Sequence, residues 1–196
     1  MSDAAATADE LLAELRARGA ILSGHFRLSS GRHSNLFVQK FRILEDPPLV
    51  ERVARALAAH ARSLAPTVVV SAAVGGIVLG YEVARQLGTL GIFVEKENGV
   101  PALRRGFALD PDDRAFVVED VVTTGGSVRE VLDVVRARGA TVGGVGIIVR
   151  RAPADFGVPT TALLDLPIES FDPEHCPQCA AHEPITEPGS RFLKSK

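Results

Sequence analysis

The residues with the clearest potential for chemistry are two adjacent carboxylates and the polar loop that follows them. Glu119 and Asp120 end an apolar run at 116–118, and residues 123–127 supply three hydroxyls and two adjacent glycines. Glycines let the backbone approach a phosphate closely, and the free N–H groups of a loop that opens a helix favour an anion. The carboxylates suit a neighbouring sugar, because they accept hydrogen bonds from vicinal hydroxyls and balance a developing positive charge. The candidate site comprises Glu119, Asp120, Val121, Val122, Thr123, Thr124, Gly125, Gly126 and Ser127.

Two well-known phosphate-binding motifs do not match this loop. It has no Gly-Lys-Ser/Thr of a Walker loop and no Gly-x-Gly-x-x-Gly dinucleotide fingerprint. A plainer interpretation is a strand-to-helix turn with Ser127 as the N-cap and Glu130 closing a capping box. That interpretation accounts for Ser127 and Glu130, but it leaves two acidic residues at the end of an apolar strand unexplained.

A weaker pattern lies near the end of the sequence. Cys176 and Cys179 form a single CxxC, flanked by His175 and His182. A structural zinc site needs four ligands, and these four could form one only with unusual geometry or across a dimer. A redox pair needs a thioredoxin-like context, which is missing. We therefore favour an ordinary turn over a metal site at this point.

Alternating strands and helices must position the carboxylates and the phosphate loop. Short apolar runs predict buried strands at 67–72, 91–94, 116–118, 141–149 and 161–164. Helical spacing of apolar residues predicts helices at 7–18, around 50–64, around 79–87 and around 128–135. This alternation indicates a doubly wound, mainly parallel α/β sheet with right-handed crossovers. Such sheets bind ligands at the carboxyl ends of their strands, where residues 119–127 fall.

Two segments interrupt the alternation. Residues 20–40 contain two short apolar stretches around a Ser-Ser-Gly turn, which predicts an irregular hairpin over the surface of the domain. His25 and His33 fall in this hairpin. For His33, the sequence leaves two roles open, which are to shape a pocket or to stabilise a turn. Residues 95–102 are polar and are expected to form a loop.

The bulk properties exclude several classes of protein. The chain has 196 residues with 46% apolar and 23% charged residues and a net charge of −2. We therefore expect no nucleic-acid partner and no membrane partner. The acidic N-terminus does not resemble a signal peptide, and two cysteines do not make a disulfide scaffold, so we predict a cytoplasmic protein. One globular unit is expected, with a helix and hairpin at 1–45, an α/β core at 46–172 and a loosely packed tail at 173–196.

The segment 116–127 resembles the signature of the type I phosphoribosyltransferases, in which apolar residues, two acidic residues, two apolar residues and a Thr/Gly-rich loop follow one another. A second segment, Gly24 to Ser34, is similar to the N-terminal motif of orotate phosphoribosyltransferases, whose hairpin forms a hood over the base. We call residues 20–40 the hood. The resemblance covers roughly residues 8–172 and implies the type I phosphoribosyltransferase fold with a small N-terminal hood.

The resemblance implies a role for each matching position. Glu119 and Asp120 would hold the ribose 2- and 3-hydroxyls, and residues 123–127 would cradle the 5-phosphate, with Thr123 also touching orotate. Arg151 would face the orotate carboxylate, which a guanidinium fork matches well. The pyrophosphate loop would lie at 72–76, around Ala73 and Gly75. A plain glycine turn before a helix explains that last segment equally well.

The sequence departs from the best-known family pattern in its cations. Lysines often found in the family are replaced by Ser29 in the hood and by Gly75 in the pyrophosphate loop. The family has a mobile loop that usually carries several lysines, a histidine and glycines. In this sequence the corresponding segment is 95–107, which lacks that run. The catalytic cations are therefore predicted to be Lys96, Arg104 and Arg105, which would clamp the pyrophosphate, and a neighbouring subunit could supply them.

The implied reaction is a Mg²⁺-dependent transfer of phosphoribose from phosphoribosyl pyrophosphate (PRPP) to orotate, which gives orotidine 5'-phosphate and pyrophosphate in pyrimidine (UMP) biosynthesis. PRPP and orotate are the expected ligands, Mg²⁺ is expected to be held through PRPP without direct protein ligands, and a homodimer is expected. Positioning and electrostatic stabilisation should dominate such a reaction. The alternatives are a phosphoribosyltransferase for another base and a non-enzymatic PRPP-sensing regulator.

Overall fold

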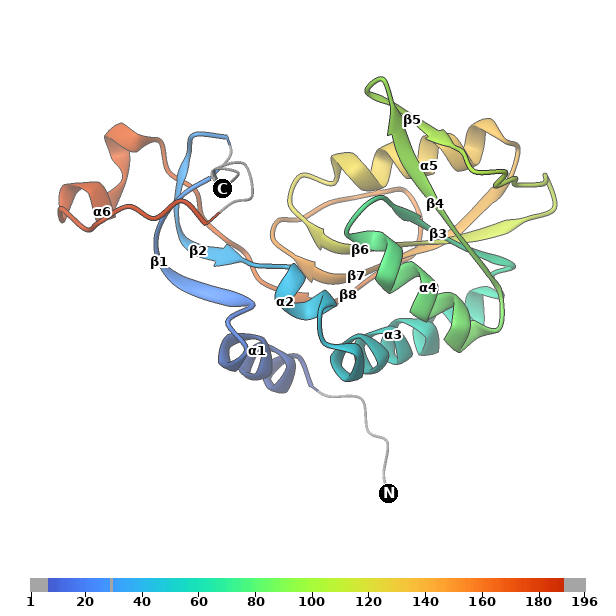
Figure 1. Ribbon diagram of the computed structural model, residues 1–196, viewed down its shortest axis with the longest axis horizontal. Coiled ribbons are helices and arrows are strands. Elements are labelled where there is room, and N and C mark those ends of the chain that lie inside the picture. Colours follow the sequence, from blue (N-terminus) through green and yellow to red (C-terminus); the bar gives the residue numbers. More distant parts are fainter. Residues whose placement is uncertain (1–6, 29, 189–196) are drawn as a thin grey trace.

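The computed structural model describes residues 7–28 and 30–188 as a six-stranded sheet flanked by helices, with a separate two-stranded hood at one end (Figure 1). The sheet has the order β5-β4-β3-β6-β7-β8, and all neighbours are parallel except β4 and β5. Its strands are β3 (Val68–Ala72), β4 (Leu90–Glu97), β5 (Val100–Leu103), β6 (Arg114–Val122), β7 (Thr141–Arg150) and β8 (Thr160–Asp165). The hood strands are β1 (Ile21–Arg27) and β2 (His33–Val38), which pair antiparallel. The predicted fold class is confirmed.

Helices cover both faces of the sheet, which is why the strands are almost entirely apolar. The helices are α1 (Ala8–Ala17), α2 (Phe41–Leu44), α3 (Pro47–Ala61), α4 (Gly76–Leu87), α5 (Gly126–Ala137) and α6 (Pro177–Ala180), with 3-10 turns at Arg62–Leu64 and Pro173–His175. Phe116 and Val118 of β6 pack with the cluster that includes α3 and α4, whereas Ala115 and Val117 pack with α5. Alternate residues of β6 therefore face opposite layers, as the pleat of a strand requires.

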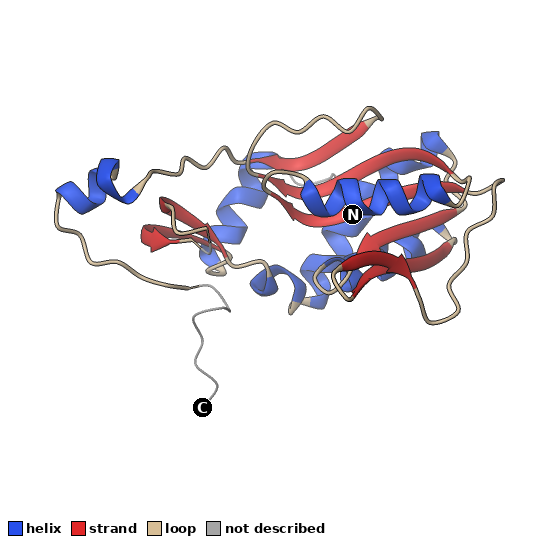
Figure 2. Cartoon of the chain, turned by 90° about the horizontal axis from the view of Figure 1, so that it is seen from above, coloured by secondary structure: helices blue, strands red, loops and turns tan. Residues whose placement is uncertain are grey.

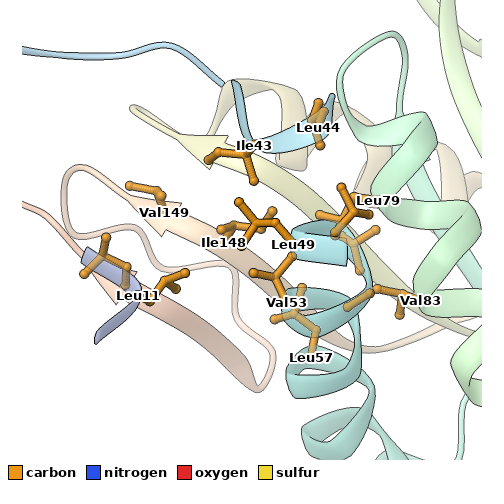
Figure 3. Packing of buried hydrophobic residues seen from close by; sticks show 14 of the residues in the cluster. Leu11, Ile43, Leu44, Leu49, Val53, Leu57, Leu79, Val83, Ile148 and Val149 are labelled. Atoms are coloured by element: carbon orange, nitrogen blue, oxygen red, sulfur yellow. The ribbon is translucent and has the colours of Figure 1, made fainter. Parts of the chain in front are cut away.

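The larger core cluster joins α1, α3 and α4 to the sheet (Figure 3). Leu49 and Leu57 of α3, Leu79 of α4 and Ile148 of β7 are all 0% exposed. Full burial of a leucine side chain contributes about 1.5–3 kcal/mol to folding. This packing holds the carboxyl ends of β3, β6 and β7 at one edge of the molecule.

Side chains cap the first backbone N–H groups of two of the helices. Thr7 and Glu10 form a capping box at α1, and the Asp46 carboxylate accepts a hydrogen bond of 2.9 Å from the backbone N–H of Leu49 at the start of α3. Among the described residues, no helix is long and apolar enough to cross a bilayer.

Two segments can be compared with the sequence-based expectations. The expected loop at 95–102 is a hairpin of β4 and β5 that extends the sheet at its edge, because the antiparallel return pairs Glu97 with Val100 and Val94 with Leu103. The tail from residue 173 lies at the hood end of the molecule (Figure 2), where Thr186 forms an isolated bridge with Phe26 and Cys176 is only 2% exposed. Most of the other described tail residues are exposed, and residues 189–196 lie outside the described residues.

Candidate active site

The two predicted carboxylates lie at the carboxyl end of β6, in the middle of the sheet. Glu119 is 6% exposed and Asp120 is 1% exposed. Because alternate residues face opposite layers, Glu119 lies on the side of α5 and Asp120 on the side of α4. Burial raises the pKa of Glu119 to about 8, with the negative charge of Asp120 adding to the shift and the Lys40 ammonium opposing it.

Lys40 is the partner of Asp120, and the sequence-based candidates did not include it. Its Nζ lies 3.0 Å from Oδ2 and 3.3 Å from Oδ1 of Asp120, and only the contact with Oδ1 has hydrogen-bond geometry. Lys40 lies two residues after the end of β2 and is the N-cap of α2. The end of the hood therefore positions this cation beside the sheet. The rarity of lysine is a signal in the sequence that points to Lys40, since only four of the 22 basic residues are lysines.

The predicted pyrophosphate loop passes beside this ion pair. Gly75 is buried between β3 and α4, and a Cβ atom at this position would collide with the carboxylate of Asp120 and the ammonium of Lys40. A side chain at residue 75 would therefore displace at least one of these two groups. Ala73 and the exposed Val74, whose connecting peptide bond is cis, form the outer part of the loop. The Lys40 ammonium thus sits where the family often has a lysine side chain in the loop itself.

The phosphate loop has the open backbone that anion binding needs. Helix α5 begins at Gly126 with Gly125 as its N-cap at φ 80°, and no side chain caps its first N–H groups. The alternative of a capping box with Ser127 as the N-cap is therefore wrong. Residues 121–128, with Glu119 and Glu130, line a pocket of about 270 Å³ at this helix start. Unpaired N–H groups and the helix dipole favour a phosphate there.

A second pocket of about 610 Å³ lies between the phosphate loop and the hood. Arg27, Arg32 and Lys40 line it from the hood side, and Thr123, Thr124 and Arg151 line it from the sheet. Thr123 and Thr124 line both pockets, so the two pockets lie side by side at these residues.

Of the two adjacent residues Arg150 and Arg151, Arg151 is the one that lines this second pocket. Arg150 forms a two-pronged ion pair of 2.6 and 2.9 Å with Asp165 on β8. The backbone N–H of Arg151 donates to the Val122 carbonyl, which fixes the residue beside the phosphate loop. Its Nε is buried without a hydrogen-bond partner among the described residues, and burial lowers the pKa of the guanidinium. A buried cationic donor without a partner is costly, and an anionic ligand would satisfy it.

The three predicted loop cations differ in the residues that they contact. Lys96 lies on β4, whereas Arg104 and Arg105 directly follow β5. The Lys96 ammonium lies 2.8 Å from Oε1 of Glu130, a residue that lines the phosphate pocket. Arg104 pairs with Glu97 at 3.2 Å and Arg105 with Glu95 at 3.0 Å, and neither arginine lines the two pockets. The structure therefore gathers the β6 carboxylates, the phosphate loop, Gly75, Lys96 and Arg151 at one sheet edge, and it leaves the two arginines outside. Ser29 lies outside the described residues.

Comparisons with known proteins agree with this arrangement. A family model described as the phosphoribosyl transferase domain matches residues 41–155. An orotate phosphoribosyltransferase of Pelotomaculum thermopropionicum is 51% identical over 189 residues, which cover 95% of this chain and 100% of that protein. The crystal structure of orotate phosphoribosyltransferase from Aeropyrum pernix superposes with a TM-score of 0.65 at 30% identity, covering 80% of this chain and 93% of the other. An adenine phosphoribosyltransferase from Rhodothermus marinus, with a TM-score of 0.62 at 24% identity over 80% of this chain and 98% of the other, shares the fold alone.

Proposed function

The chain belongs to the orotate phosphoribosyltransferase family, and from this premise we propose how its site transfers the phosphoribosyl group of PRPP to orotate. The products are orotidine 5'-phosphate and pyrophosphate, a step of pyrimidine biosynthesis. The 5-phosphate binds in the pocket at the start of α5, where the backbone N–H groups of the phosphate loop and its hydroxyls donate to it. Glu119 and Asp120 accept hydrogen bonds from the ribose hydroxyls.

The observation that carries this proposal is that the two pockets adjoin at Thr123 and Thr124, which line both of them. A nucleotide has its phosphate and its base on opposite sides of the ribose, so a ligand with phosphate in the smaller pocket places its base in the larger one. There the base meets Arg151, whose Nε has no partner among the described residues. An arginine fork binds a carboxylate by two parallel hydrogen bonds. Orotate carries such a carboxylate, and uracil, adenine and hypoxanthine do not.

The chemistry rests on charges that the chain places around the anomeric carbon. Displacing pyrophosphate builds positive charge on the sugar and negative charge on the leaving group. The Asp120 carboxylate offsets the first, whereas Glu119, with its raised pKa, acts through hydrogen bonds to the ribose. Lys40 beside Gly75 and Lys96 beside Glu130 offset the second. The ion pair with Lys40 also holds the Asp120 carboxylate in place.

Mg²⁺ fits this site, because the carboxylates offer oxygen atoms and Oδ2 of Asp120 accepts no hydrogen bond from the described residues. Mg²⁺ prefers oxygen ligands and keeps several waters, so PRPP oxygens would supply most of its coordination, with Glu119 and Asp120 nearby. When bound, it neutralises charge on the pyrophosphate.

A homodimer accounts for the two arginines that lie outside the pockets. Arg104 and Arg105 directly follow β5, the edge strand of the β4–β5 hairpin, which rises above the rest of the sheet (Figure 1). Within this chain both are paired with the hairpin's own glutamates. On a second copy of the chain they would reach the pyrophosphate of the first and add the cations that its loop 72–76 lacks.

The experiment follows orotate absorbance in purified protein with PRPP and Mg²⁺, beside parallel reactions with uracil, adenine and hypoxanthine. We expect orotate alone to be consumed. Arg151→Gln should raise the KM for orotate with a small effect on the KM for PRPP, and Asp120→Asn should abolish turnover. Consumption of another base with orotate untouched would refute the assignment of Arg151, and PRPP binding without turnover of any base would refute the proposed activity.

A further inference from the structure

Four potential metal ligands from distant parts of the sequence converge beneath the hood. His25 lies on β1 and His33 on β2, while Cys176 and Cys179 flank the start of α6 in the C-terminal segment. One ligand atom of each residue lies within 4.8 Å of all the others. His25, His33 and Cys176 are 3%, 4% and 2% exposed, so the cluster is closed to solvent on most sides.

Four of the distances within the cluster are close to the edges of a tetrahedron around one ion. Zinc bonds of about 2.3 Å to sulfur and 2.0–2.1 Å to nitrogen place neighbouring ligand atoms about 3.3–3.8 Å apart in a tetrahedral site. In this chain His25 Nε2 lies 3.1 Å from His33 Nδ1, and the Sγ of Cys179 lies 3.2 Å from His33 Nδ1. The same Nε2 lies 3.5 Å from the Sγ of Cys176 and 3.7 Å from that of Cys179.

Hydrogen bonding alone does not explain this convergence. The Nε2 atom of His25 has one position for a hydrogen bond, yet three polar atoms approach it. The opposite ring nitrogen, Nδ1, lies 2.9 Å from the carbonyl oxygen of Glu183 and donates to it, which leaves the lone pair of Nε2 directed into the cluster. A carbonyl that orients the far nitrogen of a histidine is the usual outer support of a metal ligand.

We propose that His25, His33, Cys176 and Cys179 bind one Zn²⁺ ion that locks the C-terminal segment onto the hood. Two thiolates and two imidazoles in a tetrahedral arrangement favour zinc over Mg²⁺ or Ca²⁺, which prefer oxygen ligands. All four coordination positions are filled by side chains, so the site is structural and leaves no position for substrate. The sequence pattern alone had suggested His175 and His182 as partners of the cysteines, but both are exposed and the hood histidines take their place.

The ion would brace the wall of the base pocket. The segment that carries the cysteines also pairs with the hood through its backbone, since Thr186 donates to the carbonyl of His25 and Arg27 donates to the carbonyl of Thr186. Arg27 and Arg32 line the pocket of about 610 Å³, and Pro188 lines it from the tail. The zinc site therefore holds the hood at a fixed distance from the phosphate loop without touching the substrates.

Metal content of the full-length protein tests the proposal directly. Purified wild-type protein, washed free of loosely bound ions, should contain about one zinc per chain by elemental mass spectrometry, and Cys176→Ser or Cys179→Ser should contain below about 0.1. His175→Ala removes an exposed histidine from the same turn and should retain the zinc. Equal zinc in all four proteins would overturn the proposal, as would iron in place of zinc.

A second measurement remains decisive if the cysteine variants do not fold. Wild-type protein stripped by a chelator should bind one Co²⁺ and develop the visible bands of a tetrahedral thiolate site, and added Zn²⁺ should remove them. Absence of these bands would overturn the proposal. Absence of both thiols in freshly purified protein that is unfolded in the presence of a chelator would do so too, because Cys176 and Cys179 would then be joined in a disulfide instead of ligating the ion.

Hydrogen exchange locates the effect of the ion within the molecule. Amides of residues 21–38 should exchange about tenfold faster or more in the stripped protein, whereas amides of β6 should be unchanged. The accompanying rise in the KM for orotate rests on the proposed function, but metal content and exchange do not, so the two ideas can fail separately. Unchanged exchange in the hood after complete zinc removal would refute the bracing role.

Discussion

Replacement of Glu119 by Gln should change how the stability of the ligand-free protein depends on pH. Glu119 is 6% exposed, and it shares its strand end with the 1%-exposed Asp120, while Lys40 provides one positive charge for the two carboxylates. Burial, reinforced by Asp120, raises the pKa of Glu119 from the ordinary 4.5 to about 8. Between these two values the folded protein holds a proton on Glu119 that the unfolded chain has released.

The sign and size of the effect follow from this difference. A folded state that binds more protons than the unfolded state loses stability as pH rises. At ~1.4 kcal/mol per pH unit, the contribution of Glu119 to the free energy of unfolding should fall by about 3.5 kcal/mol at most between pH 5 and pH 8. Glu119→Gln has no proton to release, so this part of the pH dependence should disappear and the variant should be more stable than wild type at pH 8.

Urea unfolding of both proteins at several pH values from 5 to 8 measures the effect. The difference between the two curves cancels the titration of all other groups that the substitution leaves unchanged. Val100→Ala is the control, because Val100 is 64% exposed and carries no titratable group, so its curve should be parallel to that of wild type. Parallel curves for wild type and Glu119→Gln would refute the reasoning, since Glu119 would then be ionised in the folded protein at pH 5.

Three further substitutions test other parts of the structure. Gly75→Ala should lower kcat/KM for PRPP on the order of 10²-fold, because the new Cβ would displace the Asp120 carboxylate, and steady-state kinetics measures this. Lys96→Ala should lower kcat on the order of 10²-fold with intact folding by circular dichroism, and unchanged kcat would remove Lys96 from the catalytic cations. Leu57→Ala should cost about 2–5 kcal/mol in urea unfolding because the side chain is 0% exposed, whereas Leu90→Ala, 72% exposed, should change the free energy of unfolding by less than about 0.5 kcal/mol.

The parts of the site that were predictable from the sequence are those formed by consecutive residues. The carboxylates and the phosphate loop occupy one continuous segment, so their residue types and spacing already contain the geometry of a strand end followed by a helix start. The predicted strand at 116–118 was too short, since β6 continues through Glu119 and Asp120 to Val122. Apolar content alone underestimates a strand whose last residues are polar because they carry the site.

Contacts between distant segments could not be predicted in this way. Lys40 reaches Asp120 across 80 positions, and Cys176 meets His25 across 151 positions. No local pattern specifies such pairs, because the arrangement in space of segments that are distant in sequence decides them. The β4–β5 hairpin was missed for a different reason, since its polar residues and Pro101 are atypical of a strand and are tolerated only at the edge of the sheet.

The separation in sequence between the two sides of the base pocket also fixes the order in which the site is completed during folding. The phosphate loop needs only β6 and α5, which are contiguous, whereas the hood joins Arg32 to Ser170 across 138 positions. Closing a long chain segment costs more entropy than closing a short one, and distant contacts therefore form late. A newly made chain would acquire its phosphate pocket while residues 168–188 are still unplaced, and its base pocket would be complete only when nearly the whole chain is in place.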